Sequence, residues 1–210
     1  MSPGSPGLPL LEARGIEKAY GRTAVLRGAS FQVRPGEIVG IVGENGSGKS
    51  TLLRIVAGLL RPSGGTVRLR GRLGYCDQEP LLFPLLTVAE HFRYFASAYG
   101  LRDARQWQDT KRMLLDRFGY ARWEHTMAEH LSGGTRQKLN LSIALLHQPE
   151  LVVLDEPYLA FDWETYLRFW DHAAELRAAG RAVVIVSHLA HDQARFDRLL
   201  ALREGVLQCA

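Results

Sequence analysis

A glycine-rich segment at residues 43–51 has the composition of a phosphate-binding loop. It reads Gly-Glu-Asn-Gly-Ser-Gly-Lys-Ser-Thr. Its glycines let the backbone turn N–H groups toward a β-phosphate, Lys49 can reach the β and γ oxygens, and the Ser50 hydroxyl can ligate Mg²⁺. The residues predicted to bind nucleotide phosphates are Gly43, Asn45, Gly46, Ser47, Gly48, Lys49, Ser50 and Thr51.

A second candidate anion-binding element is Leu131-Ser132-Gly133-Gly134. It precedes residues 135–147, whose sequence is typical of a helix. The first N–H groups of a helix have no partner within the helix, and they attract anions. The sequence therefore predicts two phosphate-binding elements in one chain.

Two adjacent carboxylates, Asp155 and Glu156, follow the aliphatic run at 151–154. At the end of a buried strand, Asp155 is expected to contact Mg²⁺ through water. Glu156, beside the γ-phosphate, would position the attacking water and accept its proton. A solvated acidic pair before a turn proline is the alternative, but it does not explain the four aliphatic residues that precede the pair.

Three apolar runs, at residues 37–42, 151–154 and 182–186, predict the buried strands of a parallel sheet. A run without polar alternation is typical of a strand covered on both faces. A helix is predicted over 49–58, so the glycine-rich loop lies between a strand and a helix, as the loop motif requires. Further strands are predicted within 11–34 and at 66–69, 73–76 and 205–208, and further helices at 87–99, 103–118 and 163–179.

Composition excludes several classes of protein. The net charge is +4, and no block of Lys and Arg marks a nucleic-acid-binding arm. The two cysteines, Cys76 and Cys209, indicate a reducing compartment without a disulfide or a structural metal. No apolar run is long enough to cross a membrane, and residues 1–9 have the composition of a disordered tail rather than a signal peptide.

Taken together, the motifs closely resemble those of the nucleotide-binding subunit of an ATP-binding cassette (ABC) transporter, with features of bacterial exporters. The resemblance extends from Tyr20 to about Leu207. Six motifs occur in the order found in that family: Walker A at 43–51, the Q-loop glutamine at Gln78, the signature motif at 131–137, Walker B at 151–156, the D-loop aspartate at Asp162 and the switch histidine at His188.

The resemblance implies roles for residues that carry little signal alone. Tyr20 would stack on adenine, although an ordinary strand-end tyrosine is the alternative. Gln78 would contact Mg²⁺ and the attacking water, and His188 would hydrogen-bond the γ-phosphate. Gln78 thus joins Ser50 and Asp155 as a metal-site residue, and joins Glu156 and His188 as a catalytic one.

The implied fold class is α/β: a P-loop NTPase core with a mostly parallel sheet, an N-terminal antiparallel β subdomain and an α-helical signature lobe. Residues 10–210 would form one ABC ATPase domain. Within it, 10–78 and 149–210 would be the catalytic core and 79–148 the helical lobe.

The resemblance also implies partners. Ser132 and Gly134 would face ATP bound in the Walker A loop of a second copy, so that a homodimer encloses two ATP molecules. A separate transmembrane permease would hold the subunit on the cytoplasmic face of the membrane and export a cargo. The apolar loop at 80–86 could form part of the groove that receives a coupling helix of this permease, and simple packing of the helical lobe is the alternative. The alternative is an ABC-type regulatory nucleotide-binding module that does not transport. At 210 residues the chain holds neither the paired cassettes of ribosome-acting ABC proteins nor the coiled coil of DNA-repair ABC ATPases.

Three positions depart from the family pattern. Thr135 replaces the usual glutamine of the signature motif and Lys138 the usual arginine, whereas the serine and glycines are intact. We expect activity to persist, with altered packing at the start of the helix. Leu159 replaces the usual D-loop serine, which puts communication between subunits through that loop in doubt.

Overall fold

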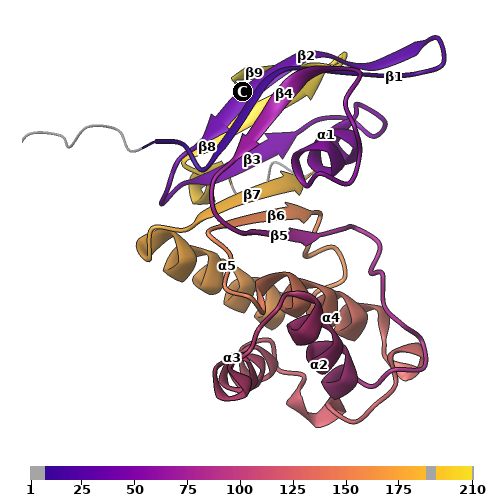
Figure 1. The fold of residues 1–210 in the computed structure, drawn as a ribbon, viewed down its shortest axis with the longest axis vertical. Helices are drawn as coiled ribbons and strands as arrows, with labels where there is room; N and C mark the ends of the chain where they lie inside the picture. Colours follow the sequence, from indigo (N-terminus) through magenta and orange to yellow (C-terminus); the bar gives the residue numbers. More distant parts are fainter. Residues whose placement is uncertain (1–7, 188–192, 210) are drawn as a thin grey trace, which may run out of the picture.

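The antiparallel part of the molecule is a three-stranded sheet near the N-terminus (Figure 1). The computed structural model describes residues 8–187 and 193–209. Strand β1 (Leu11–Tyr20) pairs with both β2 (Thr23–Val33) and β4 (Gly64–Leu69), which gives the order β2-β1-β4. Tyr20 pairs with Thr23 at the tip of the β1–β2 hairpin.

The larger sheet has six strands in the order β5-β6-β7-β3-β8-β9. Its first five strands are parallel, and β9 runs antiparallel to β8. The fold class predicted from the sequence is confirmed. The strands are β3 (Ile38–Val42), β5 (Leu73–Cys76), β6 (Leu151–Asp155), β7 (Ala182–Ser187), β8 (Arg198–Arg203) and β9 (Val206–Cys209).

Both faces of this sheet are buried, which accounts for the unbroken apolar runs. Leu151 and Val153 of β6 pack into a core with α1 (Lys49–Val56) and the antiparallel sheet. Val152 and Leu154 point to the opposite face and pack into the core formed with the other helices. Successive strand side chains point to opposite faces, so a strand between two layers needs aliphatic residues at every position.

Helices α2 (Val88–Ala98), α3 (Ala104–Arg117) and α4 (Gly133–Leu145) gather on the side of the larger sheet away from the antiparallel sheet (Figure 1). Helix α5 (Trp163–Ala178) lies on the same side and packs against β7, while α4 packs against β5. A capping box starts α2, because Thr87 Oγ1 accepts from Glu90 N and the Glu90 carboxylate accepts from Thr87 N. Within the described ranges, no helix has the length and apolarity needed to span a membrane.

Strand β8 is the element that the sequence analysis did not predict. Its apolar residues 199–202 are flanked by Arg198 and Arg203, and the charged residues on both sides made this short run hard to identify as a buried strand. Arg198 donates to the Gln32 carbonyl (2.8 Å) and lies 3.1 Å from the Glu37 carboxylate. The guanidinium charge is therefore paired with the Glu37 carboxylate at the edge of the core, and the strand can begin with a charged residue.

Candidate nucleotide-binding site

The glycine-rich loop connects the end of β3 to the start of α1, as its sequence predicts. Gly46 and Gly48 have φ angles of 80° and 101°, which favour glycine. A Cβ on Gly48 would also lie 2.9 Å from Val25 Cγ1, so the close approach of strand β2 requires glycine there. The backbone is thus held in a turn that other residues would strain.

Lys49 is buried at the first position of α1, and its ammonium group is held by the loop itself. Lys49 Nζ donates to the carbonyl oxygens of Gly43 (2.7 Å) and Glu44 (2.8 Å). Burial lowers the pKa of Lys49, and the negative charges of Glu156 and Asp155 oppose this shift. The Lys49 ammonium group is therefore held at the loop, where it can bind an anionic ligand.

A cleft of about 590 Å³ opens beside the loop and brings together residues from three parts of the chain. The start of α1 contributes Lys49 and Ser50, the segment after β5 contributes Gln78, and the turn after β6 contributes Glu156. The cleft has the size of small-molecule sites in proteins, which span roughly 300–1,000 Å³. Its other lining residues are Val25, Asn45, Gly46, Gly48, Thr51 and Leu159.

Asp155 lies at the end of β6 with 1% of its surface exposed. Burial raises the pKa of Asp155, while a hydrogen bond from the Ser50 side chain lowers it. Asp155 Oδ2 is buried and has no hydrogen-bond partner among the described residues. Asp155 is not itself a cleft-lining residue, but its bonding partner Ser50 lines the cleft together with Gln78, and these oxygen atoms fit the all-oxygen ligands of Mg²⁺ or its bound water.

Glu156 sits at a strained position directly after β6. Its φ angle is 47°, which is rare for a residue other than glycine, and its N–H donates to the Val186 carbonyl (3.0 Å). Strain of this kind persists only where the surrounding structure enforces it, and it is frequent at functional sites. Here it turns the Glu156 side chain to line the cleft.

Ser132, Gly133 and Gly134 begin helix α4, but none of them is among the described residues that line the cleft. Ser132 is the N-cap, with its Oγ accepting from Thr135 N (3.2 Å). A Cβ on Gly134 would lie 2.6 Å from the Ala160 carbonyl, whereas a Cβ on Gly133 would meet no atom within 4 Å. Gly134 thus permits packing against the D-loop, while Gly133 faces open space.

The three residues that depart from the family pattern each have a defined place in the structure. Thr135 Oγ1 lies 2.9 Å from Ser132 Oγ, so the threonine hydroxyl hydrogen-bonds the N-cap side chain. Lys138 Nζ lies 3.3 Å from Asp162 Oδ2, which joins the signature helix to the N-cap of α5. Leu159 is half exposed and lines both the cleft and an adjoining groove of about 250 Å³ that Gly133 also lines.

Of two further predicted site residues, one lies apart from this cluster and the other is outside the described part of the chain. Tyr20 is 53% exposed, with Lys18 Nζ 5.3 Å from the centre of its ring, and it is absent from the cleft lining among the described residues. Ser187 ends β7, and His188, which follows it, lies outside the described residues.

Sequence reasoning missed Val25 as a cleft residue, and it missed the contacts of Asp77. Val25 carries no motif and is identified only by its approach to Gly48.

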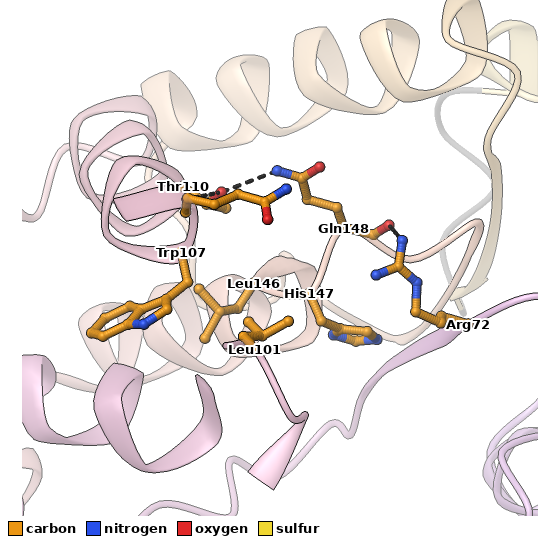
Figure 2. Close-up of a pocket in the computed structure, with 8 residues that line it drawn as sticks. Arg72, Leu101, Trp107, Thr110, Leu146, His147 and Gln148 are labelled. Atoms are coloured by element: carbon orange, nitrogen blue, oxygen red, sulfur yellow. Dashed lines mark hydrogen bonds between the residues drawn. The ribbon is translucent and has the colours of Figure 1, made fainter. Parts of the chain in front are cut away.

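A second cavity, of about 60 Å³, lies in the helical region and shares no described lining residue with the cleft (Figure 2). There Gln148 Nε2 donates to Thr110 Oγ1 (3.1 Å), and Trp107 and Leu101 form an apolar wall.

The loop, the acidic pair and the helical start of the signature motif together define a P-loop nucleotide-binding domain. Comparison with known proteins makes this assignment more specific. The sequence profile of the ABC transporter family matches residues 26–159. The chain belongs to this family.

Relatives in the family act in both directions of transport. The chain is 33% identical to the Nod factor export ATP-binding protein I of Ralstonia nicotianae, over 97% of this chain and 67% of the relative. It is 36% identical to the ribose import ATP-binding protein RbsA of Pseudomonas putida, over 94% of this chain and 42% of the relative. The chain spans only 37 to 42% of the length of several curated relatives.

A solved structure supports the fold. The dimeric ATP-binding cassette MJ0796, in a post-hydrolysis state bound to ADP and Pi, superposes with a TM-score of 0.85 at 25% identity. The match covers 94% of this chain and 96% of that chain.

Proposed function

We propose that this chain binds and hydrolyses ATP as the nucleotide-binding subunit of an ABC transporter. The observation that carries the proposal is the cleft that gathers Lys49, Ser50 and Gln78 around the strained Glu156. A cation, two oxygen donors and a carboxylate in one cleft are the groups that hydrolysis of a phosphoanhydride needs.

The proposed chemistry assigns each group a step. The N–H groups of the loop and Lys49 hold the β and γ phosphates of ATP. Ser50, Asp155 and Gln78 would hold Mg²⁺, which neutralises the charge of the phosphate oxygens when bound. Glu156 orients a water and accepts its proton as the water oxygen bonds to the γ-phosphorus. The bond to the β-phosphate oxygen then breaks, and its electron pair leaves on ADP.

We propose further that two copies are needed for turnover. Gly133 has open space around it and does not line the cleft beside the Walker A loop of its own chain, so the start of α4 is accessible to a nucleotide held by another copy. A second copy placed head to tail would supply its Walker A loop to this surface. The dimeric post-hydrolysis cassette to which this chain is similar supports the arrangement. Tyr20 against adenine and His188 against the γ-phosphate complete the proposed site.

The proposed partner is a separate integral membrane permease that holds the subunit on the cytoplasmic face. The segment between Gln78 and α2 exposes large apolar side chains: Leu81 is 80% exposed, and Leu85 and Phe83 are also exposed. Exposed apolar groups next to a cleft residue favour a protein contact. We propose export as the direction of transport, as in the name of the Nod factor relative. Import, as in the name of the ribose relative, is the alternative direction. No nucleic acid is part of the proposal.

The experiment that tests the proposed function compares the wild type with Glu156→Gln and Lys49→Ala. Glu156→Gln removes the general base but keeps the size of the side chain. We expect it to bind ATP, to accumulate as a dimer in gel filtration with ATP and Mg²⁺, and to release phosphate at least about 100-fold more slowly. Lys49→Ala is expected to weaken ATP binding itself.

Undiminished phosphate release by Glu156→Gln would contradict the assignment of the base. A wild-type chain that binds ATP but releases no phosphate, alone or with its permease, would contradict the whole proposal. That result would favour the regulatory nucleotide-binding module instead.

A further inference from the structure

Asp77, which directly precedes Gln78, connects three elements of the fold. Its carboxylate accepts hydrogen bonds from Tyr75 OH at the end of β5 (3.1 Å) and from Arg54 in the last turn of α1 (3.3 and 3.4 Å). Its backbone carbonyl accepts from Asn140 Nδ2 of α4 (2.9 Å). One residue thus contacts both the helix that follows the phosphate-binding loop and the helix that begins with the signature motif.

Asn140 has no local reason to occupy its position in α4. Asparagine is a poor residue for a helix interior, and a buried amide is costly unless it is hydrogen-bonded. Asn140 is nevertheless only 9% exposed, and its Nδ2 group donates to Asp77 O and to Cys76 Sγ (3.2 Å). Both acceptors lie at the end of β5, so the side chain is satisfied only when α4 and this strand end are in register.

We propose that Asn140 and Asp77 are positioning residues that fix Gln78 relative to α1 and to the signature helix. The inference rests on the proposed function, because it assigns a purpose to the placement of Gln78 in the ATP cleft. Asn140 is buried on α4, seven residues beyond Gly133, and a rigid helix transmits a shift at one end to the other. A shift of the signature motif would therefore move Asp77, and with it Gln78, by a comparable amount.

The arrangement differs from a simple packing contact because Asp77 is held from both sides. Arg54 fixes its carboxylate to the catalytic core, while Asn140 fixes its carbonyl to the helical region. Loss of either contact leaves Gln78 attached to one helix only. Misplacement of a catalytic group by about 1 Å can lower a rate by about 100-fold, so even partial release should be measurable.

The kinetic test uses Asn140→Ala and Asn140→Asp, with Ser142→Ala as the matched control. Ser142 lies on the same helix and is also buried, but its Oγ bonds Tyr120 OH (2.7 Å) and the Lys138 carbonyl (2.8 Å), away from Gln78. We expect both Asn140 variants to lower kcat for ATP about tenfold with KM within about twofold, the size expected for one buried hydrogen bond. Ser142→Ala also loses buried hydrogen bonds, so we expect it to lower Tm about as much as the Asn140 variants do. Its kcat should stay within about twofold of the wild type.

A second readout does not require hydrolysis. Hydrogen–deuterium exchange of the peptide covering residues 77–86 is measured in each variant without nucleotide. We expect exchange to be about fivefold to tenfold faster in Asn140→Ala and Asn140→Asp, and unchanged in Ser142→Ala, because the Asn140 amide donates to the Asp77 carbonyl whereas the Ser142 hydroxyl bonds Tyr120 and the Lys138 carbonyl.

Two results would overturn the inference. One is wild-type exchange of residues 77–86 in both Asn140 variants. The other is a fall in kcat for Ser142→Ala as large as that for Asn140→Ala, which would mean that any loss of stability in α4 slows turnover. If the wild type binds no ATP or releases no phosphate, the proposed function fails, and the exchange measurement alone then decides whether Asn140 holds this segment.

Discussion

Gly133 and Gly134 are adjacent in the sequence, yet the structure gives each a different reason to lack a side chain. A Cβ on Gly134 would lie 2.6 Å from the Ala160 carbonyl, whereas Gly133 has open space. Gly134 is needed for folding of its own chain. Gly133 is free for contact with another molecule.

This difference yields a prediction for a pair of variants. Gly134→Ala forces the Ala160 backbone to move and is expected to lower Tm, with a cost of about 1–3 kcal/mol. Gly133→Glu keeps Tm near the wild-type value but places a carboxylate where a phosphate of the second copy would bind, so it should abolish phosphate release. Thermal unfolding and phosphate release, measured on both variants, check the pair. A Gly133→Glu variant that hydrolyses ATP normally would remove the case for a shared site.

Thr135, which replaces the usual glutamine of the signature motif, contacts the Ser132 hydroxyl. Thr135 Oγ1 hydrogen-bonds Ser132 Oγ at 2.9 Å, a contact that a valine could not make. We expect Thr135→Val to retain the backbone cap and the fold, but to alter the ATP concentration needed for dimerisation by a few-fold. Gel filtration across a range of ATP concentrations measures this. An unchanged ATP dependence would show that the departure is neutral.

At the scale of elements, the predicted strands and helices are those whose patterns reflect two-sided burial or helical spacing. Apolar residues within 37–42, 151–154 and 182–186 pack on both faces of the sheet, so a nearly continuous apolar run was sufficient to identify these strands. Strand β8 was missed because arginines flank four apolar residues, and their partners at Gln32 and Glu37 are remote in the sequence.

The candidate site was predictable to a similar extent. The residues of the glycine-rich loop and the acidic pair lie on short segments, so their spacing alone indicated a site, and Lys49, Ser50 and Glu156 among them line the cleft. The link from Asp77 to Arg54 and Asn140 joins residues far apart in the chain, and no local pattern marks it. Contacts of this kind depend on packing of whole elements and become visible only in the folded molecule.

Helix α5 offers a test of element stability. Asp162 caps it by accepting from Thr165 N (2.8 Å), and this bond together with the Lys138 charge lowers the pKa of Asp162 to about 2. Asp162→Ala should destabilise the chain by about 1 kcal/mol, whereas Asp162→Asn, which can still cap, should cost less. A carboxyl with a lowered pKa contributes stability above pH 4 that is lost as pH falls toward 2. Urea unfolding at pH 7 measures the order of the two variants, and equal losses would contradict the capping role.

At the scale of the whole molecule, a buried histidine predicts how stability depends on pH. Burial lowers the pKa of His172 to about 4, so between pH 6.5 and 4 the unfolded chain binds a proton that the folded chain does not. Stability should therefore fall as pH drops through this window, by up to about 1.4 kcal/mol per pH unit from this residue. Urea unfolding at pH 7 and pH 5 should show a smaller pH effect in His172→Leu than in the wild type. An identical pH effect would show that His172 titrates normally.

The proposed unit of function is the dimer rather than the single chain. Gly133 at the start of α4 is not among the described residues that line the cleft beside the Walker A loop, so each intact site would combine the loop of one copy with the signature motif of the other. Such a head-to-tail pair closes with two equivalent sites. A defect in one motif should then be rescued by a copy that carries a defect in the other.

Phosphate release by a mixture of Lys49→Ala and Gly133→Glu chains tests this central claim most directly. Each variant alone forms dimers in which both sites lack an essential part, and we expect neither to release phosphate. A mixed dimer contains one intact site, because the loop of Gly133→Glu meets the signature motif of Lys49→Ala. Random pairing then predicts roughly one quarter of the wild-type rate for an equal mixture. A mixture as inactive as its components, beside an active wild type, would contradict the shared site.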